Sequence, residues 1–220
     1  MSGSLRISVL FDFICPWCLI GKRNLSQALQ LFAIEQPQTN VELDWVGVQL
    51  LPDLPASGVA FAEFYLHRLG SAEAVRQRQA QVQSAAASAG VDIDLQRIPR
   101  MPNTADAHRL LTHASALGNA SQQDQLLEML FAAYFINGQD IGDSATLLNI
   151  AEACGYPRAV LGNALRGDGS PFKGSAMASG GGVPAFVFNQ RLMLSGAQPA
   201  QVLLDGMLRA VGQTCEVSPV

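Results

Sequence analysis

The sequence contains no long apolar run, few cysteines and little net charge. No uninterrupted apolar stretch approaches the ~18 residues of a membrane-spanning helix, so we expect no membrane partner. Lysine and arginine total 14 against 18 acidic residues, which gives a formal net charge of −4. A charge this weakly acidic offers no electrostatic footprint for nucleic acid, and we expect no nucleic-acid partner. Four cysteines among 220 residues are too few for a disulfide-bonded scaffold.

The beginning of the chain also lacks the pattern of a cleavable targeting segment. The first strand-like run, LRISVLFDF, starts at Leu5 and leads directly to Cys15, so a cleavage there would remove part of the segment that positions this cysteine. We therefore expect a cytoplasmic protein. In that compartment most thiols are kept reduced.

The hydrophobic residues, 49% of the chain, follow periods that change along it. Alternation predicts a strand over Leu5–Phe13, helical spacing predicts a helix from Pro16 to about Gln36, and residues 41–48 alternate again like a second strand. Together these elements form a β-α-β unit. After the breaker LPDLPASG at 51–58, successive segments carry helical spacing and the strand signal disappears.

Helical segments continue to about Gly167, with Ser121 and Ser144 as candidate N-caps. Strand character returns on either side of Asn189-Gln190, which predicts a hairpin. A closing helix follows, and apolar residues fall on one of its sides: Val202, Leu203, Met207, Ala210 and Val211.

This order of elements predicts an α/β protein with a thioredoxin-like fold and a large all-helical insertion. We expect the first half of the thioredoxin-like domain at residues 1–52, the insertion at 53–167 and the second half at 168–220.

Two cysteines, Cys15 and Cys18, lie where the first strand is predicted to meet the first helix, in VLFDFICPWCLIG. Unsatisfied N–H groups and the positive end of the helix dipole favour thiolate over thiol at such a position. Pro16 fits the first helical position because its missing N–H costs no hydrogen bond there. A thiolate attacks disulfides, and Cys18, one turn later, is placed to resolve the resulting mixed disulfide. The pair therefore predicts a redox couple.

A zinc site and a structural disulfide are the alternatives for this pair. Zinc would need two further ligands, and the chain offers no second close pair of cysteines or histidines, so we expect no metal. A structural bridge would be unusual in a reducing compartment, and so short a loop contributes little stability. The other two cysteines, Cys154 at a helix end and Cys215 in a polar tail, are expected to be inert.

The segments DFICPWCLIGKRNL and GGVPAFVFNQRLMLSGAQP resemble the DsbA-like thioredoxin family, and specifically its cytoplasmic FrnE-like branch. Within the insertion, VQLLPDLPASG, MPNTADAHRLLTHA and LFAAYFINGQDIGD resemble stretches of that branch in the same order. The resemblance implies a disulfide oxidoreductase with Cys15 as nucleophile and Cys18 as resolving thiol. It also implies that Pro184 is a cis-proline whose preceding residue, Val183, meets the substrate chain.

Other residues near the pair carry weaker expectations. Trp17, between the two cysteines, is expected to be an exposed platform that contacts substrate together with Pro16. Many thioredoxin-fold enzymes carry a buried carboxylate six residues before the nucleophile, where this chain has Val9, and the nearest acid is Asp12. For Lys22 and Arg23, in the next helical turn, we expect a solvated helix face; the alternative is that they help to hold anionic thiolates or glutathione.

These observations favour a thiol-disulfide oxidoreductase acting on protein or peptide thiols and disulfides. It would need no resident cofactor, with glutathione as a candidate co-substrate. One alternative is a glutathione-dependent isomerase or transferase related to 2-hydroxychromene-2-carboxylate isomerase, which would not require Cys18. Another is a non-catalytic binding or chaperone module that uses the helical insertion and Trp17. For His108, within the insertion, we expect a partly buried structural role and not a place beside substrate.

Overall fold

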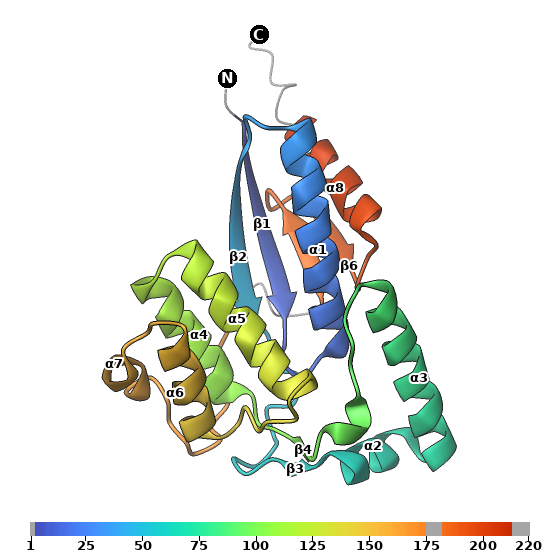
Figure 1. Ribbon diagram of the computed structural model, residues 1–220, viewed down its shortest axis with the longest axis vertical. Coiled ribbons are helices and arrows are strands. Elements are labelled where there is room, and N and C mark those ends of the chain that lie inside the picture. The colour runs from blue at the N-terminus through green and yellow to red at the C-terminus, as the bar shows by residue number, and fades with distance from the viewer. Residues whose placement is uncertain (1–2, 175–181, 213–220) are drawn as a thin grey trace. The chain divides into compact units, whose positions relative to one another are not determined.

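The computed structural model describes residues 3–174 and 182–212, and the chain divides into two compact units. Unit 1 combines residues 1–48 with residues 174–220, and unit 2 comprises residues 49–173. The predicted fold class is confirmed: a thioredoxin-like α/β fold is interrupted by a large, mainly helical insertion (Figure 1).

Unit 1 is built on a four-stranded mixed sheet with the order β2-β1-β5-β6. β1 (Ser4–Phe11) pairs in parallel with β2 (Asn40–Gly47), and α1 (Pro16–Glu35) connects them. β5 (Ala185–Phe188) is antiparallel to both β1 and β6 (Leu192–Ser195). The predicted β-α-β unit and the hairpin are therefore both present.

The hairpin turns where the sequence predicts. Asn189 and Gln190 have positive φ angles of 48° and 58°, and the Arg191 N–H donates to the Phe188 carbonyl at 3.0 Å. Asparagine tolerates this left-handed conformation better than most residues. The Asn189 side chain also accepts a hydrogen bond from the Arg6 N–H at 2.9 Å, which ties the turn to β1.

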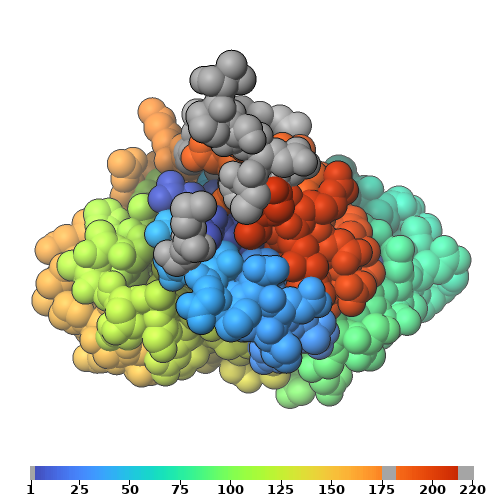
Figure 2. Space-filling model, turned by 90° about the horizontal axis from the view of Figure 1, so that it is seen from above, coloured from blue at the N-terminus to red at the C-terminus, as the bar shows by residue number. Residues whose placement is uncertain are grey.

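One face of the sheet is covered by α1 and by α8 (Ala200–Gly212), which lie side by side (Figures 1 and 2). Alternate residues of β1 point toward these helices, as the period of a strand requires. The buried side chains of this core come from four elements and include Leu5, Ile7 and Val9 from β1, Leu25 and Phe32 from α1, Phe186 and Phe188 from β5, and Leu203 and Met207 from α8. Val202, expected on the buried side of α8, is instead 39% exposed, and Leu204 is buried.

Unit 2 consists mainly of helices. In chain order they are α2 (Phe61–Leu69), α3 (Ala72–Ser88), a 3-10 turn (Leu95–Arg97), α4 (Ala105–Leu117), α5 (Ala120–Phe135), α6 (Ser144–Ala153) and α7 (Arg158–Gly162). The expectation of an all-helical insertion needs one correction, because β3 (Val59–Ala60) pairs with β4 (Arg100–Met101). Two-residue strands are too short to produce a periodic signal.

The helix caps also differ from the expectation by one or two residues. Asn119, not Ser121, caps α5, and it forms a capping box with Gln122. Asp143, not Ser144, caps α6 by accepting the Thr146 N–H at 2.8 Å. In both cases an equally good capping residue lies one or two positions before the expected serine, so the sequence alone does not decide between them.

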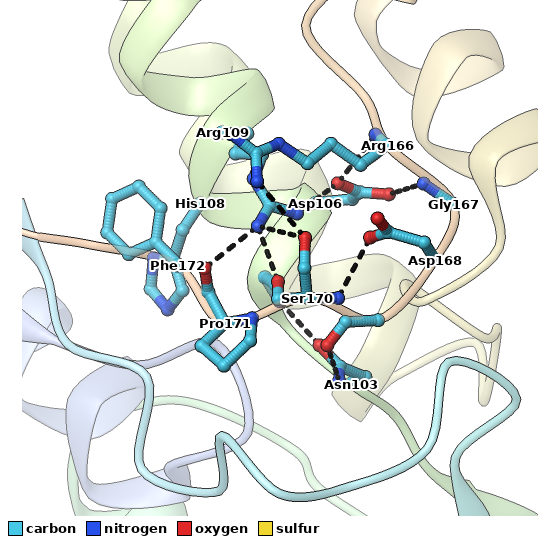
Figure 3. A network of polar contacts seen from close by, with 12 residues as sticks. Asn103, Asp106, His108, Arg109, Arg166, Gly167, Asp168, Ser170, Pro171 and Phe172 are labelled. Carbon is cyan, nitrogen blue, oxygen red and sulfur yellow. Dashed lines mark hydrogen bonds and ion pairs between the residues drawn. The ribbon is translucent and has the colours of Figure 1, made fainter.

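The segment that follows α7 is held against α4 by a buried ion pair (Figure 3). Asp106, 6% exposed, accepts from Arg109 Nη1 at 2.6 Å and from the backbone N–H groups of Arg166 and Gly167 at 3.0 and 2.7 Å. Arg109 in turn donates to the Pro171 carbonyl at 3.0 Å. These bonds tie residues on both sides of position 167 to α4, within unit 2.

Replacing Asp106 should destabilise the protein strongly. In Asp106→Ala the Arg109 charge stays buried without its carboxylate, and we expect the free energy of unfolding to fall by about 3 kcal/mol or more. The control is Glu152→Ala, which breaks an exposed ion pair with Arg158 at 3.6 Å and should cost below about 1 kcal/mol. Urea denaturation measures both variants. Equal losses of unfolding free energy in the two variants would show that the buried ion pair stabilises the protein no more than the exposed one.

Candidate active site

Cys15 occupies the N-cap of α1, directly after the turn that ends β1. Its backbone is extended, with φ −90° and ψ 109°, and the helix begins at Pro16. The turn is closed by the Cys15 N–H, which donates to the Asp12 carbonyl at 3.1 Å. The thiol therefore lies beside the first N–H groups of a 20-residue helix, the position that the sequence predicts.

Cys18 lies one turn into the same helix. Its N–H donates to the Cys15 carbonyl at 2.9 Å, and both residues are free thiols. Cys15 is 7% exposed and Cys18 only 2% exposed. Attack from outside therefore reaches Cys15 more easily, in agreement with the predicted roles of nucleophile and resolving thiol.

The pKa of Cys18 is raised well above its ordinary value of 9.0. Burial is the largest cause, because it disfavours the charged thiolate. The hydrogen bond with Cys15, the charge of Cys15 and the charge of Asp12 raise the pKa further, while a backbone hydrogen bond from Asp12 lowers it. Cys18 is thus held as a neutral thiol near neutral pH.

The loop before β5 brings Val183 and Pro184 to the cysteine pair. The Cys15 thiol lies 3.7 Å from the Val183 carbonyl oxygen, which it contacts as a weak donor. The Val183–Pro184 peptide bond is cis, and Pro184 is buried. The structure therefore places Val183 and Pro184 beside Cys15 and Cys18, as the sequence predicts. Substrate binding by Val183 and Pro184 stays a prediction.

Gly21 is a residue of this site that sequence reasoning missed. A Cβ atom at this position would lie 3.1 Å from both the Pro184 Cγ and the Phe186 Cζ atoms, closer than ordinary van der Waals contact. Only a residue without a side chain lets α1 approach the loop so closely. A glycine in the middle of a predicted amphipathic helix, three residues after Cys18, was the available signal.

Asp12 and Lys22 are two buried charged residues close to the cysteine pair in the sequence. Asp12 is completely buried and Lys22 is 4% exposed, so the solvated position expected for Lys22 is wrong. Lys22 precedes the buried Leu25 by three residues and so lies on the same face of α1. Val9 packs into the core of unit 1, and Asp12 is the acid whose charge acts on Cys18.

Pro16 and Trp17 are both half-buried. Trp17 is therefore less exposed than a platform standing free in solvent would be, although part of its ring remains accessible. Contact of either residue with substrate stays a prediction.

The other two cysteines and His108 take no part in the arrangement around Cys15 and Cys18 that the structure describes. The Cys154 thiol is buried at the end of α6, 3.3 Å from the Met129 sulfur, and burial raises its pKa. Cys215 lies outside the described residues. His108 is 1% exposed and stacks on Phe172 within unit 2. In the described part of the chain, no three His, Cys, Asp or Glu side chains are arranged to hold a metal ion.

A family model described as a DSBA-like thioredoxin domain matches residues 6–171. The chain belongs to the DSBA-like thioredoxin family. The match spans the cysteine pair and nearly all of the insertion, the two features that define this domain here. No curated protein sequence matches the chain.

Solved structures share the fold of this DSBA-like domain. A probable DsbA oxidoreductase from Streptomyces coelicolor is 23% identical with a TM-score of 0.79, over 98% of this chain and 92% of that one. A 2-hydroxychromene-2-carboxylate isomerase is 16% identical with a TM-score of 0.64, over 97% and 100%. The cytosolic disulfide reductase DsbM from Pseudomonas aeruginosa, solved with GSH, is 20% identical with a TM-score of 0.51, over 93% and 99%. Identities this low establish the fold alone.

Within residues 3–174 and 182–212, none of the helices combines the length and the hydropathy needed to span a bilayer.

Brief alkylation at neutral pH should modify Cys15 before Cys18. Cys15 is the more exposed thiol and lies at a helix N-terminus, whereas the raised pKa of Cys18 leaves little of the reactive thiolate. Cys15→Ala removes the two contributions of Cys15 to the raised pKa, but burial, the largest cause, remains, so labelling of Cys18 should stay slower than in the unfolded chain. Mass spectrometry after an iodoacetamide pulse measures both, with urea-unfolded protein as the control for intrinsic reactivity. Faster labelling of Cys18 in the folded wild type would reverse the assignment.

Removing the Asp12 charge should lower the pKa of Cys18. A carboxylate opposes a second negative charge beside it, so Asp12→Asn makes the Cys18 thiolate easier to form. The shift is partial, because burial remains the largest cause. Thiolate ultraviolet absorbance against pH, measured in a Cys15→Ala background, reports it, and Asp44→Asn on the exposed part of β2 is the matched control. An unchanged or higher Cys18 pKa would contradict the electrostatic role of Asp12.

Proposed function

We propose that this DSBA-like protein is a thiol-disulfide oxidoreductase that exchanges disulfides with protein or peptide substrates through Cys15 and Cys18. The observation that carries the proposal is the pairing of an N-cap thiol with a second, more deeply buried thiol one turn later, beside the loop that contains Val183. A glutathione-dependent reaction on a single thiol has no use for the second sulfur.

Each half of the reaction uses one of the two thiols. The Cys15 thiolate attacks one sulfur of a substrate disulfide, which forms a mixed disulfide and releases the other substrate sulfur as a thiolate that takes up a proton. Cys18 then loses its proton and attacks the Cys15 sulfur, which releases the second substrate thiol. The substrate gains two electrons and the protein is left with a Cys15–Cys18 disulfide. In the opposite direction the same steps oxidise a substrate dithiol.

Deprotonation of Cys18 is the step that most needs help, because burial raises the pKa of this thiol. We assign Asp12 as the group that receives the proton. It is completely buried, and its charge already acts on Cys18. Many thioredoxin-fold enzymes carry a buried carboxylate where this chain has Val9, and in this proposal Asp12 takes over its role.

The backbone beside Val183 provides a place for an extended substrate chain. Its carbonyl lies next to the Cys15 sulfur, where hydrogen bonding to a peptide backbone would orient a disulfide without depending on the substrate sequence. Part of Trp17 remains accessible and adds an apolar contact surface.

The FrnE-like resemblance of the motif and the fold shared with DsbM support a cytoplasmic site of action, with glutathione as a co-substrate. One observation favours the isomerase alternative: the 2-hydroxychromene-2-carboxylate isomerase shares the fold of this chain over its full length.

Substitution of the two cysteines should separate these functions. Cys15→Ser should reduce insulin-disulfide turnover to the uncatalysed rate, since the nucleophile is lost. Cys18→Ser should accumulate mixed disulfides on non-reducing gels, since the resolving step is lost. Cys154→Ser, which removes another buried thiol, is the matched control and should retain full turnover.

Turnover retained by Cys15→Ser would refute the oxidoreductase proposal. Glutathione-dependent conversion of 2-hydroxychromene-2-carboxylate that persists in Cys18→Ser, without insulin or ribonuclease turnover in the wild type, would establish the isomerase instead.

A further inference from the structure

Unit 2 contains an open pocket of about 420 Å³ between α4 and the segment that follows α7. Its volume falls within the range of small-molecule sites, roughly 300–1,000 Å³. The side chains that give it chemical character are Arg109, His113, Asn163, Arg166, Phe172 and Lys173. None of the described residues that line it is acidic.

The charge of this pocket is unusual for the chain. The protein carries a net charge of −4 and contains only two lysines, yet one of these and two arginines line the same pocket. His113 lies one helical turn after Arg109 on α4 and is exposed. Cations that repel one another gather at low cost only where an anion compensates them.

The carboxylates nearby compensate only part of this charge. Asp106 pairs with Arg109, and its other oxygen accepts a backbone N–H. Asp168 accepts the Ser170 N–H at 2.9 Å; hydrogen bonds from Ser170, followed by the charges of Arg109 and Arg166, lower its pKa. Among the described residues, neither Arg166 nor Lys173 forms an ion pair.

The two guanidinium groups are brought together by a shared acceptor. Arg109 Nη2 and Arg166 Nη1 lie 3.2 and 3.3 Å from the same Ser170 hydroxyl oxygen (Figure 3). Arg109 is buried and fixed by its carbonyl partners, whereas Arg166 and Lys173 are exposed. A fixed cation at the base and two accessible cations at the rim form a site that can surround an oxyanion.

From this arrangement we propose that the pocket binds a small molecule that carries carboxylate or phosphate groups. Arg166 and Lys173 contact its anionic groups, Arg109 adds a fixed positive charge, and the half-buried Phe172 ring supplies an apolar wall for its carbon skeleton. This site lies within unit 2 and uses none of the residues of the cysteine pair, so it does not rest on the proposed redox function.

Binding of two probe anions tests the proposal. Isothermal titration calorimetry at low ionic strength is run with pyrophosphate in one arm and citrate in the other. We expect saturable 1:1 binding of at least one anion, weakened by about tenfold or more in Arg166→Gln/Lys173→Gln, because two charge-assisted contacts are lost. Pyrophosphate alone identifies a phosphate ligand, and citrate alone identifies a carboxylate.

The matched control is Arg76→Gln/Arg78→Gln, which removes two exposed charges from α3 in the same unit and should leave binding unchanged. Thermal melting confirms that each variant is folded. If the first double variant does not fold, Lys173→Gln alone, at an exposed residue, should weaken binding measurably. No saturable binding of either anion, or equal weakening in both double variants, would overturn the proposal.

Discussion

The close approach of α1 to the loop before β5 is the constraint on which the arrangement of the cysteine pair depends. Pro184 and Phe186 occupy the space that a side chain at position 21 would need. This contact fixes the helix against the loop one turn beyond Cys18. Because helix and loop are held together, the N-cap thiol of Cys15 stays beside the Val183 carbonyl. The geometry of the dithiol thus follows from backbone packing in the core.

That packing also places the second thiol in an apolar setting, which sets its chemistry. Burial raises the pKa of Cys18 because it disfavours the charged thiolate, and the negative charge of the buried Asp12 carboxylate raises it further. With its pKa raised in this way, Cys18 is a neutral thiol near neutral pH. The two sulfurs therefore differ in environment: the more exposed Cys15 is suited to attack substrate, and the buried Cys18 is suited to resolve the mixed disulfide in the proposed reaction.

Much of this could be predicted from the sequence, because the signals are local. The strand before Cys15, Pro16 at the first helical position and the turn at Asn189-Gln190 each depend on residues close in sequence. The close contact of Gly21 depends on α1 meeting a loop more than 160 residues later, and no local pattern reports such a meeting. The prediction for Val202 on α8 was wrong for a related reason: the consecutive apolar residues Val202, Leu203 and Leu204 leave the buried face undecided until neighbouring elements select it.

The final segment of the insertion differs from the core of unit 1, because buried charges hold it in addition to the stacking of Phe172 on His108. Asp106 satisfies two backbone N–H groups after α7 and holds Arg109, whose other bonds fasten Ser170 and Pro171. The Asp106 carboxylate is paired with Arg109 and does not neutralise Arg166 or Lys173, which the same segment presents at the pocket. The structural ion pair and the accessible cations are therefore two results of one arrangement. A ligand with anionic groups would complete the charge balance that the polypeptide leaves open.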